Sequence, residues 1–224
     1  MAPTSSGSFA HQSRSRPSLI AIAALSLIAL AYSHSIVAPF VWDDHTLIEY
    51  NPRALRLNAV TDYFSNSFWS DPFDDNRGYF RPFTTLTFAL DYALWQGNPV
   101  GFHLTNLFLH LACALLVFLL ARQGGASPAV AGLASAFFGV HPRLTESVAW
   151  ISGRTDVLAT LGALAGFYLH HLPSRTKWTA LAAAACILLG LLSKEVAIAA
   201  VVGIVVSETR SCWLGRARWG GCAR

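Results

Sequence analysis

Long apolar stretches recur along this chain and are separated by short polar turns, a pattern typical of helices that cross a membrane. A helix needs about 20 mostly apolar residues to cross the hydrocarbon core of a bilayer, and the first stretch has that length. The last stretch stops short of a full span. The predicted spans are residues 19–38, 104–121, 128–140, 157–172, 178–192 and 196–206. The pattern therefore predicts an all-α membrane protein, a polytopic helical bundle with about six spans.

The first polar segment sets the expected orientation of this bundle. Residues 1–17 are rich in serine, carry Arg14 and Arg16, and are expected to form a disordered cytoplasmic lead. Basic residues before a first span favour the cytoplasmic side. A cleaved signal peptide has a similar pattern. Because further apolar segments follow, we expect instead an uncleaved anchor with a cytoplasmic N-terminus, and a membrane domain over residues 18–206.

The longest polar segment, residues 39–102, is predicted to be a loop on the outer side of the membrane. It holds most of the acidic residues and many aromatic ones. A loop of this length is rarely without structure in a compact protein, so we expect short helices at the membrane surface. Residues 84–95, which include Asp91, form one such predicted helix, and Gly97-Asn98-Pro99 ends it.

Composition agrees with a membrane protein and argues against a nucleic-acid-binding one. Hydrophobic residues make up 54% of the 224 residues and charged residues 12%, whereas soluble domains carry about 25% charged residues. The net charge of +4 comes from scattered basic residues, so we expect no nucleic-acid partner. Lysine occurs only as Lys177 and Lys194, while arginine and alanine abound. This bias suggests a GC-rich gene, and hence a bacterial inner membrane rather than the endoplasmic reticulum.

Three cations fall in the short loops of the predicted outer side, which usually carry few of them. Arg143 and Arg154 lie between the third and fourth spans, and Lys194 lies between the fifth and sixth. Arg154 and Lys194 also stand at the start of predicted helices, whose N-termini favour anions and present free N–H groups to a phosphate. Their position predicts a site for a lipid-linked phosphate, with its tail in the bilayer and its head group at the outer face.

An acidic pair follows the first span directly. Asp43, Asp44 and His45 stand where the first helix should emerge into water. One interpretation is a solvated helix end, with Trp42 in the aromatic belt of the membrane interface. Carboxylates are costly beside a bilayer and often functional there. The other interpretation is therefore a site in which a carboxylate acts as general base on a hydroxyl.

The second span begins with a polar face. His103, Asn106 and His110 follow an i, i+3, i+7 spacing, which puts them on one side of a helix. Membrane helices commonly contact one another through such residues. We therefore expect a packing role for this face in preference to direct catalysis.

Five short motifs occur in one order along the chain and together resemble a known family. They are Val41-Trp42-Asp43-Asp44, Tyr79-Phe80-Arg81-Pro82-Phe83, His103-Leu104-Thr105-Asn106, the segment from His141-Pro142 through Thr145-Glu146 and Gly153-Arg154 to Asp156, and Leu192-Ser193-Lys194-Glu195. The set is similar to the transmembrane, tetratricopeptide-repeat-containing O-mannosyltransferases and their bacterial relatives, which are glycosyltransferases of the GT-C fold. The resemblance covers residues 18–206.

The resemblance implies transfer of a sugar, mannose in the eukaryotic members, from a polyprenyl-phosphate carrier to a protein hydroxyl, with inversion at the anomeric carbon. The implied partners are the lipid-linked sugar, a protein acceptor and membrane lipid. Asp43 and Asp44 would lie at the catalytic centre, with Asp43 as the expected base. The expected ligands of the donor phosphate are Arg154, Lys194 and Arg81. The residues expected to shape the site are His45, His141, Glu146, Asp156 and Glu195.

The chain departs from that family after residue 206. The sixth apolar segment is short, and no 34-residue helical repeat follows it. We therefore expect a truncated family member, and an inactive fragment is one interpretation of it. The basic tail, residues 207–224, is expected to be a frameshift product or else a disordered tail on anionic lipid.

Other functions fit parts of the pattern. A transporter would line its path with residues such as Asn106 and His110, but the charged residues gather at the outer rim rather than at the midplane. A non-catalytic assembly subunit would fit the short sixth segment. Ligands for a divalent metal are offered by Asp43, Asp44, His45, His141 and Glu146. Because no tight ligand motif is present, we expect no metal and no cofactor.

Overall fold

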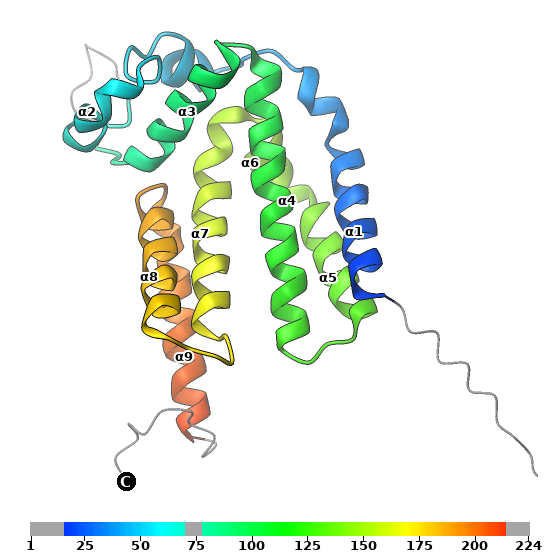
Figure 1. Cartoon of the computed structure of the whole chain (residues 1–224). Coiled ribbons are helices and arrows are strands. Elements are labelled where there is room, and N and C mark those ends of the chain that lie inside the picture. The colour runs from blue at the N-terminus through cyan, green and yellow to red at the C-terminus, as the bar shows by residue number, and fades with distance from the viewer. Residues whose placement is uncertain (1–15, 70–77, 214–224) are drawn as a thin grey trace, which may run out of the picture.

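The computed structural model describes residues 16–69 and 78–213, and within them every regular element is helical (Figure 1). The α-helices are α1 (Pro17–Ala31), α2 (Val60–Ser65), α3 (Pro82–Trp95), α4 (Pro99–Gln123), α5 (Pro128–Gly139), α6 (Thr145–Ala149), α7 (Arg154–His170), α8 (Lys177–Leu191) and α9 (Ala199–Trp213). The short 3-10 helices are η1 (Ser33–Val37), η3 (Leu57–Ala59), η4 (Pro142–Leu144), η5 (Ile151–Gly153) and η6 (Glu195–Ile198), and η2 (His45–Glu49) is a short π-helix. The all-helical prediction is confirmed, whereas most of the expected cytoplasmic lead and of the tail lies outside the described residues.

Proline and capping side chains fix where several helices begin. α3, α4 and α5 each have proline in the first turn, a position that needs no N–H donor. The side chains of Asn98 and Ser127 accept hydrogen bonds from the free N–H groups of α4 and α5. Thr176 forms a capping box with Thr179 at the start of α8. α4 therefore begins at Pro99, earlier than the predicted residue 104.

In the described residues, two helical segments are long and apolar enough to cross a membrane. They are Pro99–Gln123 and Glu195–Trp213. Three shorter helices are also apolar: Pro17–Ala31, Pro128–Gly139 and Lys177–Leu191. The first predicted span is interrupted, because α1 ends at Ala31 and η1 follows, whereas α9 continues past residue 206. The number of spans and the GT-C-like arrangement stay predictions.

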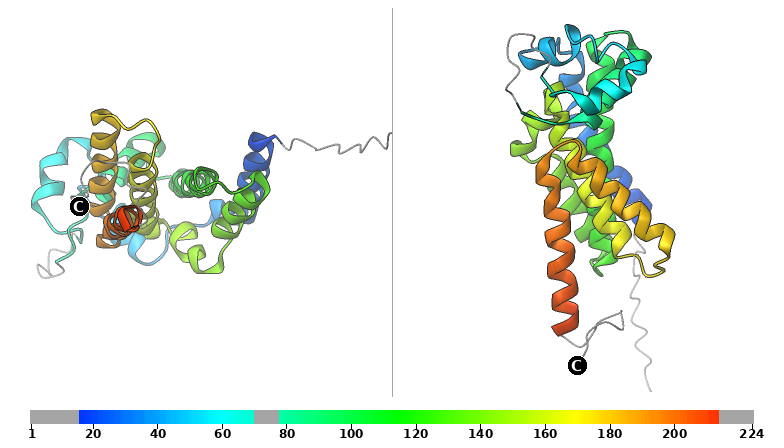
Figure 2. Two further views of the ribbon diagram at one scale, coloured as in Figure 1. Left: turned by 90° about the horizontal axis from the view of Figure 1, so that it is seen from below. Right: turned by 90° about the vertical axis from the view of Figure 1, so that its left-hand side faces the viewer.

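α4 stands in the middle of the bundle and joins its two sides (Figures 1 and 2). It packs against α1 and α5 on one side and against α7 on the other, and α7 in turn packs against α8 and α9. A buried cluster fills the space around α4: Ile28, Tyr32, Leu107, Cys113, Ala114, Val148 and Val157. Outward-facing positions also carry large apolar side chains, among them Phe108, Leu133 and Phe137. Extensive exposed apolar surface is rare on soluble monomers, so it supports a membrane protein.

Small residues allow α7 and α8 to approach closely. A Cβ atom on Gly162 would lie 2.5 Å from the carbonyl oxygen of Cys186 and 2.7 Å from the Cα atom of Gly190. Such close backbone contacts are typical of helices packed in membranes. The contact holds α8 alongside α7 and so fixes the turn after α8, which carries Lys194.

The long loop is folded, as predicted, and α3 covers the helix expected at residues 84–95. A second buried cluster joins this loop to α4 and to the connection between α6 and α7: Leu47, Ile48, Ala54, Phe68, Phe88, Phe102 and Ile151. The backbone N–H of Phe83 donates to the carbonyl of Leu192 at 3.3 Å, which ties α3 to the end of α8. The loop thus covers the end of the bundle at which α4 and α7 begin (Figure 1), and we call this the loop end.

Candidate functional site

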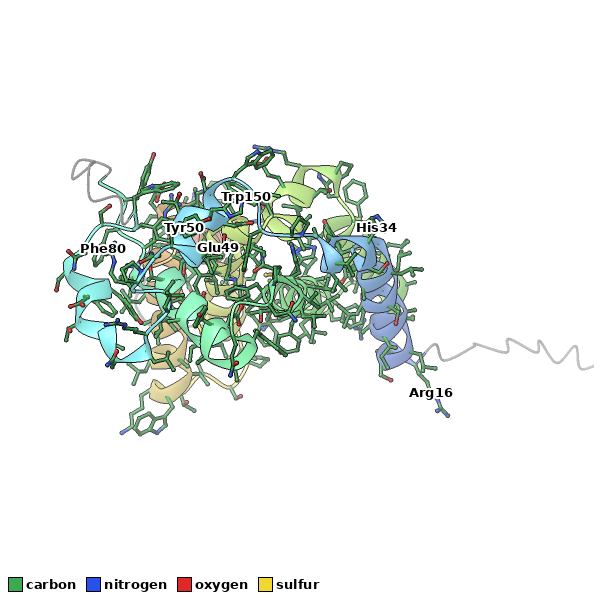
Figure 3. The ribbon with its side chains drawn as sticks, turned by 90° about the horizontal axis from the view of Figure 1, so that it is seen from above. Arg16, His34, Glu49, Tyr50, Phe80 and Trp150 are labelled. Carbon is green, nitrogen blue, oxygen red and sulfur yellow. The ribbon has the colours of Figure 1, made fainter. Side chains whose placement is uncertain are left out.

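All five sequence motifs meet at the loop end of the bundle. The side-chain pairs that join them are Asp44–Ser152, Asn106–Arg154, Asp156–Lys194 and Arg81–Glu195. Figure 3 looks onto this end, where Glu49, Tyr50 and Trp150 are labelled. Because the members of each pair are far apart in the sequence, tertiary packing rather than local structure assembles the site.

Asp44 is fully buried and fixes the acidic pair against the start of α7. Its Oδ1 accepts hydrogen bonds from the backbone N–H of Ser152 at 2.9 Å and from the Ser152 hydroxyl at 2.5 Å. Its Oδ2 accepts from the backbone N–H of Val41 at 3.1 Å. A buried carboxylate is tolerated when such donors satisfy it. The solvated helix end is therefore wrong for Asp44, which instead anchors the loop.

Trp42 has an unusual backbone beside this pair. Its φ is 50°, in the left-handed region that bulky residues rarely adopt, and its side chain is 77% exposed. The ring lies edge-on to Trp150, with ring centroids 6.0 Å apart. Residues held in this region cluster at functional sites. Asp43, the next residue, is only partly buried and so is the more accessible of the two carboxylates.

Arg154 lies in the protein interior rather than at the surface. Its side chain is fully buried, and its guanidinium donates to Asp91 Oδ2 at 2.5 Å and to Asn106 Oδ1 at 2.6 Å. Further bonds reach the carbonyls of Phe102 at 3.0 Å and Thr87 at 3.3 Å. These contacts join α3, α4 and α7 through one cation.

The carboxyl of Asp91 completes this buried network. It also accepts the hydroxyl of Thr105 at 2.8 Å. Burial raises the pKa of Asp91, and the guanidinium of Arg154 opposes that shift. These contacts use four of the five N–H donors of Arg154 inside the protein. Arg154 is therefore not the surface ligand of a phosphate that the sequence predicts, because packing of the loop against α4 covers its side chain.

Lys194 stands where the sequence predicts it, at the turn between α8 and α9. Its Nζ contacts both carboxylate oxygens of Asp156, at 2.7 and 2.9 Å. Asp156 lies in the first turn of α7, as predicted. The Lys194 side chain is 25% exposed. An ammonium group has three donors, so Lys194 keeps one N–H for a ligand while Asp156 fixes its position.

Arg81 lies beside this pair at the start of α3. Its guanidinium sits 4.8 Å from the ring centroid of Tyr79 and 5.5 Å from that of Phe68. Its nearest contact to Glu195 is 4.0 Å, and the Glu195 side chain is exposed. The Nε of Arg81 is buried without a hydrogen-bond partner among the described residues. An unpaired buried donor is costly, so this group is suited to an anionic ligand.

The other expected site-shaping residues have local partners. His45 Nδ1 lies 2.6 Å from Glu49 Oε2. His141 caps η4 by accepting the backbone N–H of Arg143 at 3.2 Å. Glu146 lies 3.8 Å from the same Arg143, on the surface. Within the described residues, no hydrogen bond or ion pair links His141 or Glu146 to Asp44 or Lys194, so their roles stay predictions.

The polar face of α4 packs as expected. His103, Asn106 and His110 are all buried. His103 contacts the carbonyl of Ala38 at 3.2 Å, and His110 contacts the carbonyl of Gly139 at 2.9 Å. Asn106 Nδ2 reaches the carbonyls of Trp150 and Ile151, each at 3.2 Å. The face therefore binds the backbone at helix ends rather than lining a path.

Two important residues were not singled out for the site from the sequence. Ser152 binds Asp44 through both its N–H and its hydroxyl, and Asp91 pairs with Arg154. Ser152 lies within the motif that ends at Asp156, but nothing in its spacing indicates a partner more than a hundred positions away. Asp91 was predicted only as part of a surface helix, and its burial depends on how α3 packs.

The metal interpretation finds no support at the loop end. Among the described residues, the one group of three side chains close enough to share an ion is His170, His171 and Glu208. That group lies at the other end of α7 and α9. The residues that the sequence offered as metal ligands, Asp43, Asp44, His45, His141 and Glu146, are not part of this group, and their roles stay predictions.

Comparison with known proteins finds a consistent set of relatives. The chain is 32% identical over 205 residues to the protein O-mannosyl-transferase Tmtc1 of Drosophila melanogaster, and 37% identical over 188 residues to Tmtc2 of the same fly. It is 32% identical over 145 residues to human TMTC3, also a protein O-mannosyl-transferase. No protein-family model matches the chain, and no solved structure matches it.

The alignments cover most of this chain but a small part of each relative. The alignment with Tmtc1 includes 89% of this chain and 23% of Tmtc1. The alignment with Tmtc2 includes 79% of this chain and 20% of Tmtc2, and that with human TMTC3 includes 64% of this chain and 16% of TMTC3. The chain thus spans less than a quarter of the length of these relatives.

Proposed function

Because the chain belongs to the TMTC family of protein O-mannosyl-transferases, we propose that it forms part of a membrane glycosyltransferase. In this proposal the loop end takes a sugar, mannose, from a polyprenyl-phosphate donor and passes it to a protein hydroxyl. One observation carries the proposal: five motifs that are separate in the sequence converge on one end of the bundle, through contacts such as Asp44–Ser152 and Asp156–Lys194.

The donor phosphate binds between Lys194 and Arg81 in this proposal. Lys194 keeps one free donor, and Arg81 keeps a buried Nε without a partner among the described residues. Charge-assisted bonds to phosphate are among the strongest hydrogen bonds in proteins. Arg154, which the sequence suggested as a third ligand, is buried and takes the role of a positioning residue that orders α3, α4 and α7 around the site.

The reaction is a single displacement at the anomeric carbon of the sugar. The oxygen of the acceptor hydroxyl forms a bond to that carbon, and the bond from the carbon to the phosphate oxygen breaks. The hydroxyl proton passes to the carboxylate of Asp43, and the polyprenyl phosphate leaves with inversion. Asp44 holds Asp43 in place through Ser152, and Lys194 stabilises the charge that develops on the phosphate.

The membrane arrangement follows the same proposal. Two helices of sufficient length, three shorter apolar ones and many outward apolar side chains support a multi-pass protein of GT-C-like organisation. The N-terminus would be cytoplasmic and the loop end would face the outer side. A bacterial inner membrane as the location stays a prediction.

Donor binding, rather than complete transfer, is the property that we assign first to this chain, because it spans less than a quarter of its relatives. A chain that binds the donor without transferring sugar would fit the non-catalytic alternative.

The two lysines of the chain provide a matched test of the donor site. Lys177 is exposed at the start of α8, far from the loop end, whereas Lys194 lies within it. We expect Lys194→Ala to weaken binding of polyprenyl-phosphate mannose about tenfold or more, since a hydrogen bond to a charged group contributes about 1.5–3 kcal/mol. Lys177→Ala should leave binding unchanged. The measurement is donor affinity of the whole chain in lipid nanodiscs, and equal effects of the two substitutions would contradict the site.

A further inference from the structure

Two histidines and a glutamate come together at the end of the bundle opposite the loop end. His170 is the last residue of α7, His171 caps that helix, and Glu208 lies in α9. One potential ligand atom from each residue lies within 4.8 Å of the other two. The nearest pair, His170 Nε2 and Glu208 Oε1, is 2.8 Å apart. In Figure 1 these helix ends lie on the side away from α2 and α3.

Both histidines contact α9 although they are neighbours in the sequence. Successive side chains on a helix point in directions about 100° apart, so they do not normally share a ligand. His171 stands at the end of the helix with φ −95° and ψ 10°, and its imidazole contacts α9. There its Nε2 contacts the hydroxyl of Ser207 at 2.8 Å, one residue before Glu208.

The surroundings favour a cation at this point. The C-terminus of α7 carries the negative end of the helix dipole, and the carboxylate of Glu208 adds a full negative charge. The His170 side chain is 17% exposed and that of Glu208 is 43% exposed, so an ion can reach the group from water. A guanidinium lies beside this group: Arg175 is 3.7 Å from Glu208 and 3.3 Å from His170 Nε2.

We propose that His170, His171 and Glu208 form a binding site for a divalent transition metal, with zinc as the ion, that joins α9 to α7. Two histidines and one glutamate are an established ligand set for zinc, with water in the fourth position. Tetrahedral zinc with bonds of about 2.0–2.1 Å places its ligands about 3.3 Å apart. The three ligand atoms lie within 4.8 Å of one another, so their side chains must move closer together to reach that spacing. Arg175 must then move aside, so the metal and the guanidinium compete.

The test uses the whole chain in detergent or nanodiscs, titrated with Zn²⁺ against a chromogenic chelator and, separately, with Co²⁺. We expect one Zn²⁺ per chain and a visible absorption band of tetrahedral Co²⁺ that Zn²⁺ abolishes. His170→Asn and Glu208→Gln should each weaken Zn²⁺ binding more than about tenfold, since even changes to the partners of metal ligands cost 10–100-fold. The matched control is His34→Asn, which removes an exposed imidazole elsewhere.

Arg175→Ala separates this proposal from a general loss of structure. If the guanidinium competes with the ion, this variant should bind Zn²⁺ more tightly than the unsubstituted chain, a gain that misfolding cannot produce. Unchanged or weaker binding in Arg175→Ala would overturn the competition. Binding that survives both His170→Asn and Glu208→Gln, or that falls equally in His34→Asn, would overturn the site.

Discussion

At the residue scale, the two carboxylates of the loop end have different environments. Asp44 is buried and saturated by Ser152 and Val41, whereas Asp43 is partly exposed beside the strained Trp42. A base needs access to the hydroxyl that it deprotonates, so Asp43 is the better candidate and Asp44 its support.

This difference predicts the effect of Asp43→Asn. The amide keeps the shape of the side chain but cannot accept the proton, so we expect mannose transfer to fall by about 10²–10⁴-fold, the usual contribution of a general base. Donor affinity should stay within about twofold. The measurement is transfer of mannose from polyprenyl phosphate in membranes that contain the chain. Asp62→Asn, an exposed carboxylate of the same loop, is the control, and an undiminished rate in Asp43→Asn would refute the assignment.

The same scale shows what residue patterns can and cannot predict. Arg154 and Lys194 were both expected to bind phosphate, because each stands at the start of a predicted helix. Lys194 lies partly exposed at its turn, but Arg154 is fully buried. The reason lies in α3, whose Asp91 covers the guanidinium, and the packing of α3 could not be derived from local spacing.

At the element scale, one buried ion pair ties the loop to the bundle. Arg154 of α7 contacts Asp91 of α3 and Asn106 of α4. Removing one partner of a buried pair leaves an uncompensated charge, which costs about 3–5 kcal/mol. We therefore expect Arg154→Met to lower the free energy of unfolding by about that amount.

The double variant Arg154→Met/Asp91→Leu distinguishes the charge from general packing. It removes both charges, so its loss of stability should be smaller than the sum of the two single losses, with an interaction energy of up to about 3 kcal/mol. The measurement is denaturant unfolding of the purified chain in detergent. Strictly additive losses would mean that Arg154 and Asp91 are not coupled.

The existence of the elements was more predictable than their ends. Apolar segments identified α1, α4, α5, α7, α8 and α9, and α3 was one of the short helices expected in the long loop. The predicted starts at residues 104 and 157 are both late, because α4 begins at Pro99 and α7 begins at Arg154. Helix ends depend on tertiary contacts such as that of Asp44 with Ser152, which local sequence does not encode.

At the scale of the whole molecule, α7 connects two sites of different chemistry. Asp156, which holds Lys194, lies in its first turn, and His170 is its last residue. At 1.5 Å per residue these positions are about 21 Å apart along the helix axis. No motif of the family resemblance includes His170, His171 or Glu208, so only the three-dimensional arrangement of α7 and α9 indicates the second site.

The separation predicts that the two sites act independently. Substitutions at distant sites without shared partners usually add within about 0.3–0.5 kcal/mol, which corresponds to about a twofold change in affinity. His170→Asn should therefore change the affinity for polyprenyl-phosphate mannose by no more than about twofold, and Lys194→Ala should change Zn²⁺ affinity equally little. Both affinities can be measured on the same nanodisc preparations, with and without the other ligand. A larger reciprocal change would show that α7 couples the two ends, because a coupling free energy acts equally in both directions, and the metal would then regulate donor binding instead of only joining α9 to α7.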